Sequence, residues 1–274
     1  MKKKIIYGAF ICAGLSAVLI ACSDDPAPAG PTTVKEWTVP LSAKNENPAP
    51  AGRTETGTAT IRLLSDNTIS YNIVVNGLAG GDALTAAHIH TGDVITNGPV
   101  IQNFSPVFSG SNATGVITTL RSTFIDSLKN AATELYFNVH STQFPGGLIR
   151  GQMNTNLEMV ADVVLSGANE VPPVTTTATG IALIRLTSDK KLYSKVTVTG
   201  LEVADALTAA HIHAAATGVN GSVILGLCAS AADFGVAKVF PVSDALFAQL
   251  KTDPIYVNAH SVIRPGGIIR GQIR

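Results

Sequence analysis

The sequence predicts an all-β protein of two tandem domains, each a Greek-key sandwich or small barrel with one short helix. The chain of 274 residues repeats itself at an offset of about 120 residues, which indicates two copies of one unit. Within each copy, short alternating or β-rich segments are separated by clusters of Gly, Asn, Asp and Pro. This spacing is typical of Greek-key β domains and not of α/β folds.

The repeat is clearest in two motifs. The segment DALTAAHIH at 82–90 returns without change at 205–213. A second motif, PGG followed by an apolar residue and IRGQ, also occurs once in each copy. Two domains of ordinary size are therefore expected at 35–153 and 159–274.

Each copy combines several strands with one helix. Apolar residues four positions apart predict a helix of two to three turns within 118–132 and within 243–253. Ser122 or a nearby Thr would cap the first helix, and Ser243 would cap the second. The strands predicted in the first copy cover 58–64, 69–75, 83–90, 134–140 and 148–153.

Residues 1–21 have the composition of a secretory signal, with three lysines before an apolar run that ends in LIAC. That tetrad resembles a bacterial lipobox, which implies cleavage before Cys22 and a lipid on its sulfur. Residues 22–34 would then be the lipidated cysteine and a proline-rich tether. An uncleaved anchor is the alternative, because the run reaches the lower edge of membrane-spanning length.

The serine and acidic residues after Cys22 resemble the export signal of some bacterial surface lipoproteins. The expected location is the bacterial cell envelope, with a lipid anchor in the outer membrane and exposure at the cell surface. The membrane is thus an expected partner. Nucleic acid is not, because the formal net charge is zero and only 14% of residues are charged. Cys228 has no cysteine left to pair with and is expected to be a buried thiol.

The chain has six histidines, and all of them lie in the repeated motifs. In a strand, residues two apart face the same side, so both histidines of each HIH segment share a face. Three imidazoles would converge in each copy if the NVH or NAH strand lay beside the HIH strand. Three histidines are a known ligand set for zinc or copper. The candidate metal ligands are His88, His90 and His140 in the first copy, and His211, His213 and His260 in the second.

The HIH pattern with a distant histidine also resembles part of the copper site of copper–zinc superoxide dismutase. No bridging histidine follows HIH in either copy, and there is no disulfide pair. These departures argue against a dismutase activity. If the histidines bind metal, the fraction of sites occupied by metal should decrease as the pH drops below about 6, because protonated imidazoles do not ligate metal.

A structural interpretation competes with the metal site. The histidines would then belong to a polar network that fixes strand register, with the repeated arginines paired to the repeated glutamates because buried charges need partners. The predicted members of this network are Glu46, Asn138, Arg150, Gln152, Glu170, Asn258, Arg270 and Gln272.

Taken in chain order, HIH at 88–90, NGPV at 97–100, a short helix and YFNVHSTQFPGGLIRGQ at 136–152 resemble the CHRD domain. This domain is named after chordin and is common in secreted bacterial proteins. The likeness covers nearly the whole chain after the tether, twice. It implies an immunoglobulin-like all-β fold and an extracellular role, without implying an enzyme activity.

Two functions are compatible with these observations. The favoured hypothesis is a non-enzymatic surface lipoprotein whose two domains bind an extracellular protein or glycan, since no catalytic motif such as GxSxG occurs. The alternative is a copper- or zinc-binding protein with one three-histidine site per domain. Copper and zinc are the only cofactors that the residues suggest.

Overall fold

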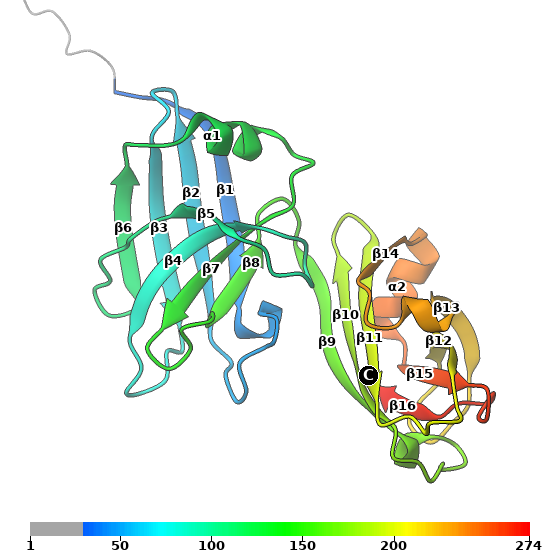
Figure 1. The fold of residues 1–274 in the computed structure, drawn as a ribbon. Coiled ribbons are helices and arrows are strands. Elements are labelled where there is room, and N and C mark those ends of the chain that lie inside the picture. The colour runs from blue at the N-terminus through cyan, green and yellow to red at the C-terminus, as the bar shows by residue number, and fades with distance from the viewer. Residues whose placement is uncertain (1–29) are drawn as a thin grey trace, which may run out of the picture. The chain divides into compact units, whose positions relative to one another are not determined.

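The computed structural model describes residues 30–274 and confirms the predicted fold class (Figure 1). Each copy of the repeat forms an eight-stranded antiparallel sheet with one α-helix. The predicted signal at 1–21 and the predicted lipidation site Cys22 lie outside the described residues. None of the helices described in 30–274 has the length and apolar character needed to cross a membrane.

The first domain contains all five strands that the sequence predicts, and three more. Its elements are β1 (Thr33–Ser42), η1 (Ala43–Asn45), β2 (Thr56–Leu64), β3 (Ile69–Asn76), β4 (Leu84–Thr91), β5 (Val100–Asn103), β6 (Asn112–Ile117), α1 (Ser122–Lys129), β7 (Leu135–Ser141) and β8 (Ile149–Gln152). Strand β1 begins at Thr33, so the last two residues of the predicted tether are part of the sheet.

The second domain repeats this order and adds one more 3₁₀ turn. Its elements are β9 (Leu157–Ser166), η2 (Gly167–Asn169), β10 (Thr179–Thr187), β11 (Lys191–Thr199), β12 (Leu207–Ala214), β13 (Ser222–Cys228), η3 (Ala231–Asp233), β14 (Lys238–Pro241), α2 (Asp244–Thr252), β15 (Ile255–Ser261) and β16 (Ile269–Gln272).

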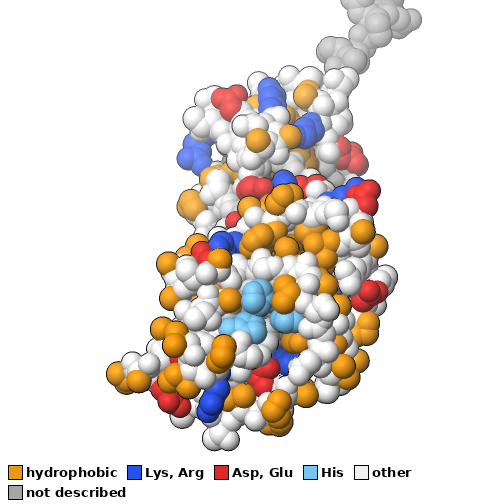
Figure 2. All heavy atoms as spheres, turned by 90° about the vertical axis from the view of Figure 1, so that its right-hand side faces the viewer, with side chains coloured by type: hydrophobic (Ala, Val, Ile, Leu, Met, Phe, Trp, Pro, Cys, Tyr) orange, Lys and Arg blue, Asp and Glu red, His pale blue; other side chains and the backbone are white. Residues whose placement is uncertain are grey.

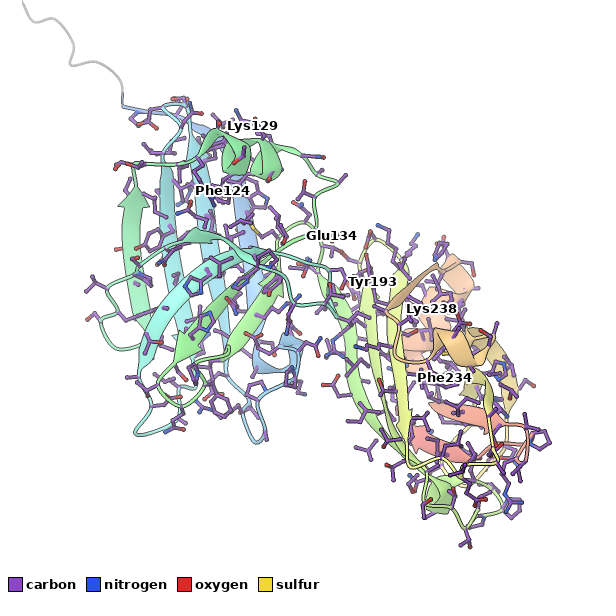
Figure 3. All side chains as sticks on the ribbon, viewed as in Figure 1. Phe124, Lys129, Glu134, Tyr193, Phe234 and Lys238 are labelled. Atoms are coloured by element: carbon purple, nitrogen blue, oxygen red, sulfur yellow. The ribbon has the colours of Figure 1, made fainter. Side chains whose placement is uncertain are left out.

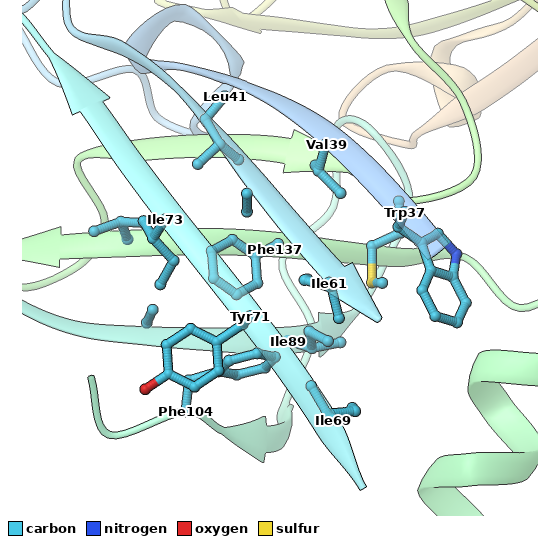
Figure 4. Close-up of a cluster of buried hydrophobic side chains, with 14 of the residues drawn as sticks. Trp37, Val39, Leu41, Ile61, Ile69, Tyr71, Ile73, Ile89, Phe104 and Phe137 are labelled. Carbon is cyan, nitrogen blue, oxygen red and sulfur yellow. The ribbon is translucent and has the colours of Figure 1, made fainter. Parts of the chain in front are cut away.

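The strands of the first domain run in the order β5-β4-β7-β8-β1-β2-β3-β6, and those of the second in the matching order. Strands β8 and β1 pair only at Arg150 and Ser42, so the sheet has two halves joined by a narrow seam. Both halves contribute to one core. Ile61 and Ile73 from β2 and β3 lie close to Ile89 and Phe137 from β4 and β7 (Figure 4).

The two helices start differently. Ser243 is the N-cap of α2, and its hydroxyl accepts a hydrogen bond from the Leu246 amide at 3.2 Å, as predicted. The predicted cap of α1 is wrong, because Arg121 occupies the N-cap position and makes no capping side-chain bond. Helix α1 is held by packing instead, with Phe124 buried in the core while Lys129 ends the helix (Figure 3).

Candidate metal centre

Strand pairing brings the three histidines of each domain together. In the first domain, β4 pairs antiparallel with β7, and His88 lies opposite Asn138 while Ala86 lies opposite His140. One ring nitrogen from each of His88, His90 and His140 lies within 4.8 Å of the others. The predicted convergence of three imidazoles is therefore present in the fold.

The second domain repeats the arrangement. Strands β12 and β15 pair in the same register, and the ring nitrogens of His211, His213 and His260 also lie within 4.8 Å of one another. Figure 2 shows one group of histidine side chains that reaches the molecular surface, with hydrophobic and other uncharged side chains next to it. In the first cluster His90 and His140 are buried and His88 is partly exposed. In the second cluster only His213 is buried, and His211 and His260 are partly exposed.

Backbone carbonyls determine which nitrogen carries the proton in two of the three imidazoles. His90 Nδ1 lies 2.9 Å from the Gly98 carbonyl oxygen, and His140 Nδ1 lies 2.9 Å from that of Pro145. A carbonyl oxygen only accepts, so each neutral ring donates from Nδ1 and keeps a free lone pair on Nε2. A backbone partner of this kind is the usual orienting contact of a metal-binding histidine.

The same partners recur in the second domain with nearly equal distances. His213 Nδ1 lies 2.9 Å from the Gly221 carbonyl oxygen, and His260 Nδ1 lies 3.0 Å from that of Pro265. Gly221 has to be glycine, because a Cβ there would lie 2.0 Å from the Ala214 carbonyl oxygen. The turn that supplies the carbonyl can therefore approach the strand closely only without a side chain.

The remaining nitrogens face the centre of the cluster. His88 Nδ1 lies 2.9 Å from His140 Nε2, so in the metal-free state His88 carries the Nδ1 proton and donates. The buried Nε2 of His90 has no hydrogen-bond partner among the described residues, and neither has that of His213. Buried polar atoms are rarely left unpaired, so each cluster contains an acceptor that needs a donor or a cation.

Burial favours the neutral form of all three imidazoles in the first domain and of His211 and His260 in the second. It is the largest cause that lowers the pKa of His88 to about 4, with further contributions from His140 and His90. Burial also lowers the pKa of His90 and His140, and in the second domain that of His211 and His260. Neutral imidazole is the form that binds metal ions.

Tyr136 lies between a histidine and an arginine. Its ring stacks on His90 with centroids 4.7 Å apart and an interplanar angle of 8°, and the Arg150 guanidinium lies 3.4 Å from the same ring. Tyr256, His213 and Arg270 repeat this in the second domain. Neither tyrosine is among the site residues predicted from the sequence. The signal was available, since Tyr136, Asn138 and His140 alternate along one strand and must share a face.

The arginines of the predicted polar network bind loops and not the glutamates. Arg150 donates to Asn97 Oδ1 at 2.8 Å, to the Thr96 carbonyl at 3.1 Å and to the Asp93 carbonyl. Arg270 does the same with Asn220 and Val219. The expected ion pairs to Glu46 and Glu170 are not among the salt bridges of residues 30–274, because loop carbonyls already satisfy both guanidinium groups.

The two glutamates are buried next to the PGG turns. A Cβ on Gly147 would lie 2.5 Å from Glu46 Oε1, and one on Gly267 would lie 2.5 Å from Glu170 Oε1, so only glycine leaves room for the carboxyl group. Burial raises the pKa of both carboxyl groups to about 7, against the opposing effects of Arg150 and Arg270. Each glutamate is therefore partly neutral at physiological pH.

The two glutamines tie the last strand of each domain to the loop after the HIH strand. Gln152 Nε2 donates to the Gly92 carbonyl at 2.7 Å, and Gln272 Nε2 donates to the Ala215 carbonyl at 3.0 Å. Asn138 and Asn258 lie closer to the histidines, with Oδ1 atoms 3.1 and 3.0 Å from Nε2 of His140 and His260. The predicted polar residues thus surround the clusters on the strands and loops that carry them.

The CHRD domain model matches residues 37–153 and again residues 161–273. The chain belongs to the CHRD domain family. It consists of two CHRD domains in tandem, and such domains indicate a β-domain binding module. No curated protein and no solved structure matches the chain. The two histidine clusters therefore have to be interpreted from their own geometry.

Proposed function

We propose that this tandem CHRD protein binds one copper or zinc ion in each domain, through His88, His90 and His140 in the first and His211, His213 and His260 in the second. One observation carries the proposal. In each cluster, two Nε2 lone pairs that backbone carbonyls have fixed in place face a shared centre, and one of them has no partner among the described residues. A cation would satisfy these lone pairs.

The donor set favours borderline transition metals. Neutral imidazole nitrogens suit zinc and copper, whereas calcium and magnesium prefer oxygen ligands. His88 would have to move its proton from Nδ1 to Nε2 to turn a lone pair toward the ion. This shift of tautomer needs no net loss of a proton, so metal uptake by neutral clusters releases few protons near pH 7.

The sequence supports a membrane-anchored location for this function. A lipid on Cys22 and a proline-rich tether would hold both domains at the bacterial cell surface, where they would meet metal ions outside the cell. Display of the domains to an extracellular protein or glycan stays a prediction from the sequence. Binding to a glycan array that survives loss of the histidines would support display.

Elemental analysis of the chain from residue 23 onward, prepared without a histidine tag and exposed to copper and zinc, tests metal binding. We expect about two ions per chain in the wild type. A variant with His88, His90, His211 and His213 changed to alanine should bind none. Wild-type protein that holds no metal after loading would contradict the proposal.

A further inference from the structure

Asn138 and Asn258 hold matching positions beside the two histidine clusters. Each lies two residues before the last histidine of its strand, so both side chains face the same side of the sheet. Both asparagines are buried, with 3% of each residue exposed. The Oδ1 atoms lie 3.1 Å from His140 Nε2 in the first domain and 3.0 Å from His260 Nε2 in the second.

Neither atom of the asparagine–histidine contact carries a hydrogen when the backbone carbonyl holds the imidazole proton on Nδ1. His140 carries its proton on Nδ1, which donates to the Pro145 carbonyl, so Nε2 and Asn138 Oδ1 both present lone pairs. An amide turned by 180° would donate from its NH₂ group instead. The oxygen faces the imidazole in both domains, however, and the unpartnered Nε2 of His90 adds a third acceptor. These three acceptors share a single donor among the cluster side chains, the Nδ1–H group of His88, and this surplus of lone pairs favours a cation.

We propose that Asn138 Oδ1 and Asn258 Oδ1 are the fourth ligands of the two metal ions, which deepens the metal-binding function proposed above and depends on it. Ligand atoms about 2.0 Å from a zinc ion lie roughly 3.3 Å apart in a tetrahedron. His140 Nε2 lies 2.9 Å from His88 Nδ1 and 3.1 Å from Asn138 Oδ1. These edges are close to tetrahedral before any movement of the side chains.

A fourth protein ligand changes what each site can do. Three histidines alone leave one position open for water or substrate, which is the pattern of catalytic zinc sites. With the asparagine oxygen in that position, the coordination sphere is closed. The geometry therefore points to two sites that bind a metal ion without catalysing a reaction on it.

Cobalt(II) substitution tests the closed site directly, because its visible absorption reports coordination number and ligand exchange. The test uses the mature chain without a histidine tag, and azide as an external ligand. We expect the cobalt spectrum of the wild type to be unchanged by azide. The double variant Asn138→Ala, Asn258→Ala should gain an azide-dependent spectrum and bind cobalt at least about tenfold more weakly.

Two further variants keep the test decisive. Asn138→Asp with Asn258→Asp retains an oxygen ligand and adds charge, so it should bind cobalt at least as tightly as the wild type and stay insensitive to azide. Asn72→Ala, at an exposed position on β3, is the matched control and should change neither property.

The outcomes separate the two proposals. Wild-type protein that binds cobalt but whose spectrum responds to azide would overturn the asparagine ligands alone. Unchanged cobalt affinity in the alanine variant would do the same, as would an aspartate variant that binds more weakly than the alanine variant. Wild-type protein that takes up no cobalt, copper or zinc would overturn the metal function itself.

Discussion

At the residue scale, burial favours the neutral form of the three histidines in the first cluster, and backbone carbonyls orient the rings of His90 and His140. The pKa of His88 is about 4, and those of His90 and His140 are also lowered. A lowered pKa means that the lone pairs stay available to a metal ion as the pH falls below the ordinary histidine value. Competition by protons should therefore begin at lower pH than the value of about 6 expected from the sequence.

Metal affinity should consequently depend only weakly on pH above about 5.5. Three ordinary histidines with pKa values near 6.5 would each lose about tenfold in availability at pH 5.5, which is about a thousandfold together. We expect a loss of less than about thirtyfold between pH 7.5 and 5.5, measured by zinc competition titrations against a chelator. A thousandfold loss would show that the imidazoles titrate as if exposed to water.

The buried glutamates should have the opposite effect on folding. The pKa of Glu46 is raised to about 7, above its ordinary value, so its neutral form stabilises the fold fully at pH 4 and less as the pH rises toward 7. Glu46→Gln should therefore be neutral at pH 4 and stabilising at pH 8, by on the order of 1–3 kcal/mol. Urea unfolding of the metal-free protein at both pH values measures this, with exposed Glu202→Gln as control. Equal effects at pH 4 and pH 8 would contradict it.

At the element scale, the strands with a clear alternating pattern could be predicted, whereas the short edge strands and the central strand β1 could not. Strands β2 and β3 alternate between buried and exposed residues, which gives a clear period of two. Strands β5 and β14 have only four residues each and none is buried, so no apolar pattern marks them. Strand β1 contains Pro40, which argues against a strand. It is tolerated because β1 pairs with β8 at a single position.

In the candidate site, too, only the contacts that follow from a side-chain pattern could be predicted from the sequence. The spacing of the HIH and NVH segments is sufficient to predict that the imidazoles converge, because a strand has a period of two. Two of the three partners of Arg150 could not be predicted, since they are the loop carbonyls of Asp93 and Thr96, which have no sequence signature. Backbone acceptors carry no side-chain identity, so the sequence suggested Glu46 instead.

One loop next to the site differs between the domains. Asp82 accepts hydrogen bonds from the Thr142 hydroxyl at 2.8 Å and the Gln143 amide at 3.1 Å, and it pairs with Arg53 at 2.6 Å. These contacts of Asp82 fix the position of the turn that contains Pro145. Asp205 accepts the equivalent amide bond from Ile263 at 3.0 Å, but it has no ion pair with an arginine within the described part of the chain.

Asp82→Asn should therefore destabilise the first domain by on the order of 1–3 kcal/mol. The change leaves the Arg53 side chain, which is 7% exposed, with only one of its two acidic partners. Asp205→Asn is the matched variant and should have the smaller effect. Amide hydrogen exchange followed by mass spectrometry localises the change: residues 141–148 should lose more protection in the first variant than 261–268 lose in the second. Equal losses would show that the ion pair does not hold the turn.

At the scale of the whole molecule, duplication has preserved the site more closely than the surrounding sequence. The loops after the two HIH segments have little sequence in common. The four contacts that define each cluster nevertheless differ by no more than 0.2 Å between the first and second domains. The distance between the two hydrogen-bonded imidazole nitrogens is 2.9 and 3.1 Å, and that from a histidine Nδ1 to the glycine carbonyl oxygen is 2.9 Å in both. The distance from the last histidine's Nδ1 to the proline carbonyl oxygen is 2.9 and 3.0 Å, and that from its Nε2 to the asparagine Oδ1 is 3.1 and 3.0 Å. Equal geometry implies equal chemistry at both sites.

The two sites should therefore bind metal independently and with affinities within about tenfold, or about 1.4 kcal/mol, of each other. Replacing His88, His90 and His140 by alanine should leave one zinc ion per chain with the wild-type affinity, and so should replacing His211, His213 and His260. Isothermal titration of both variants and of the wild type measures this, and the wild-type curve should fit two equivalent sites. If either triple variant lost both ions, the second ion would depend on the first. The two sites would then be coupled, and the second copy of the cluster would not bind an ion on its own.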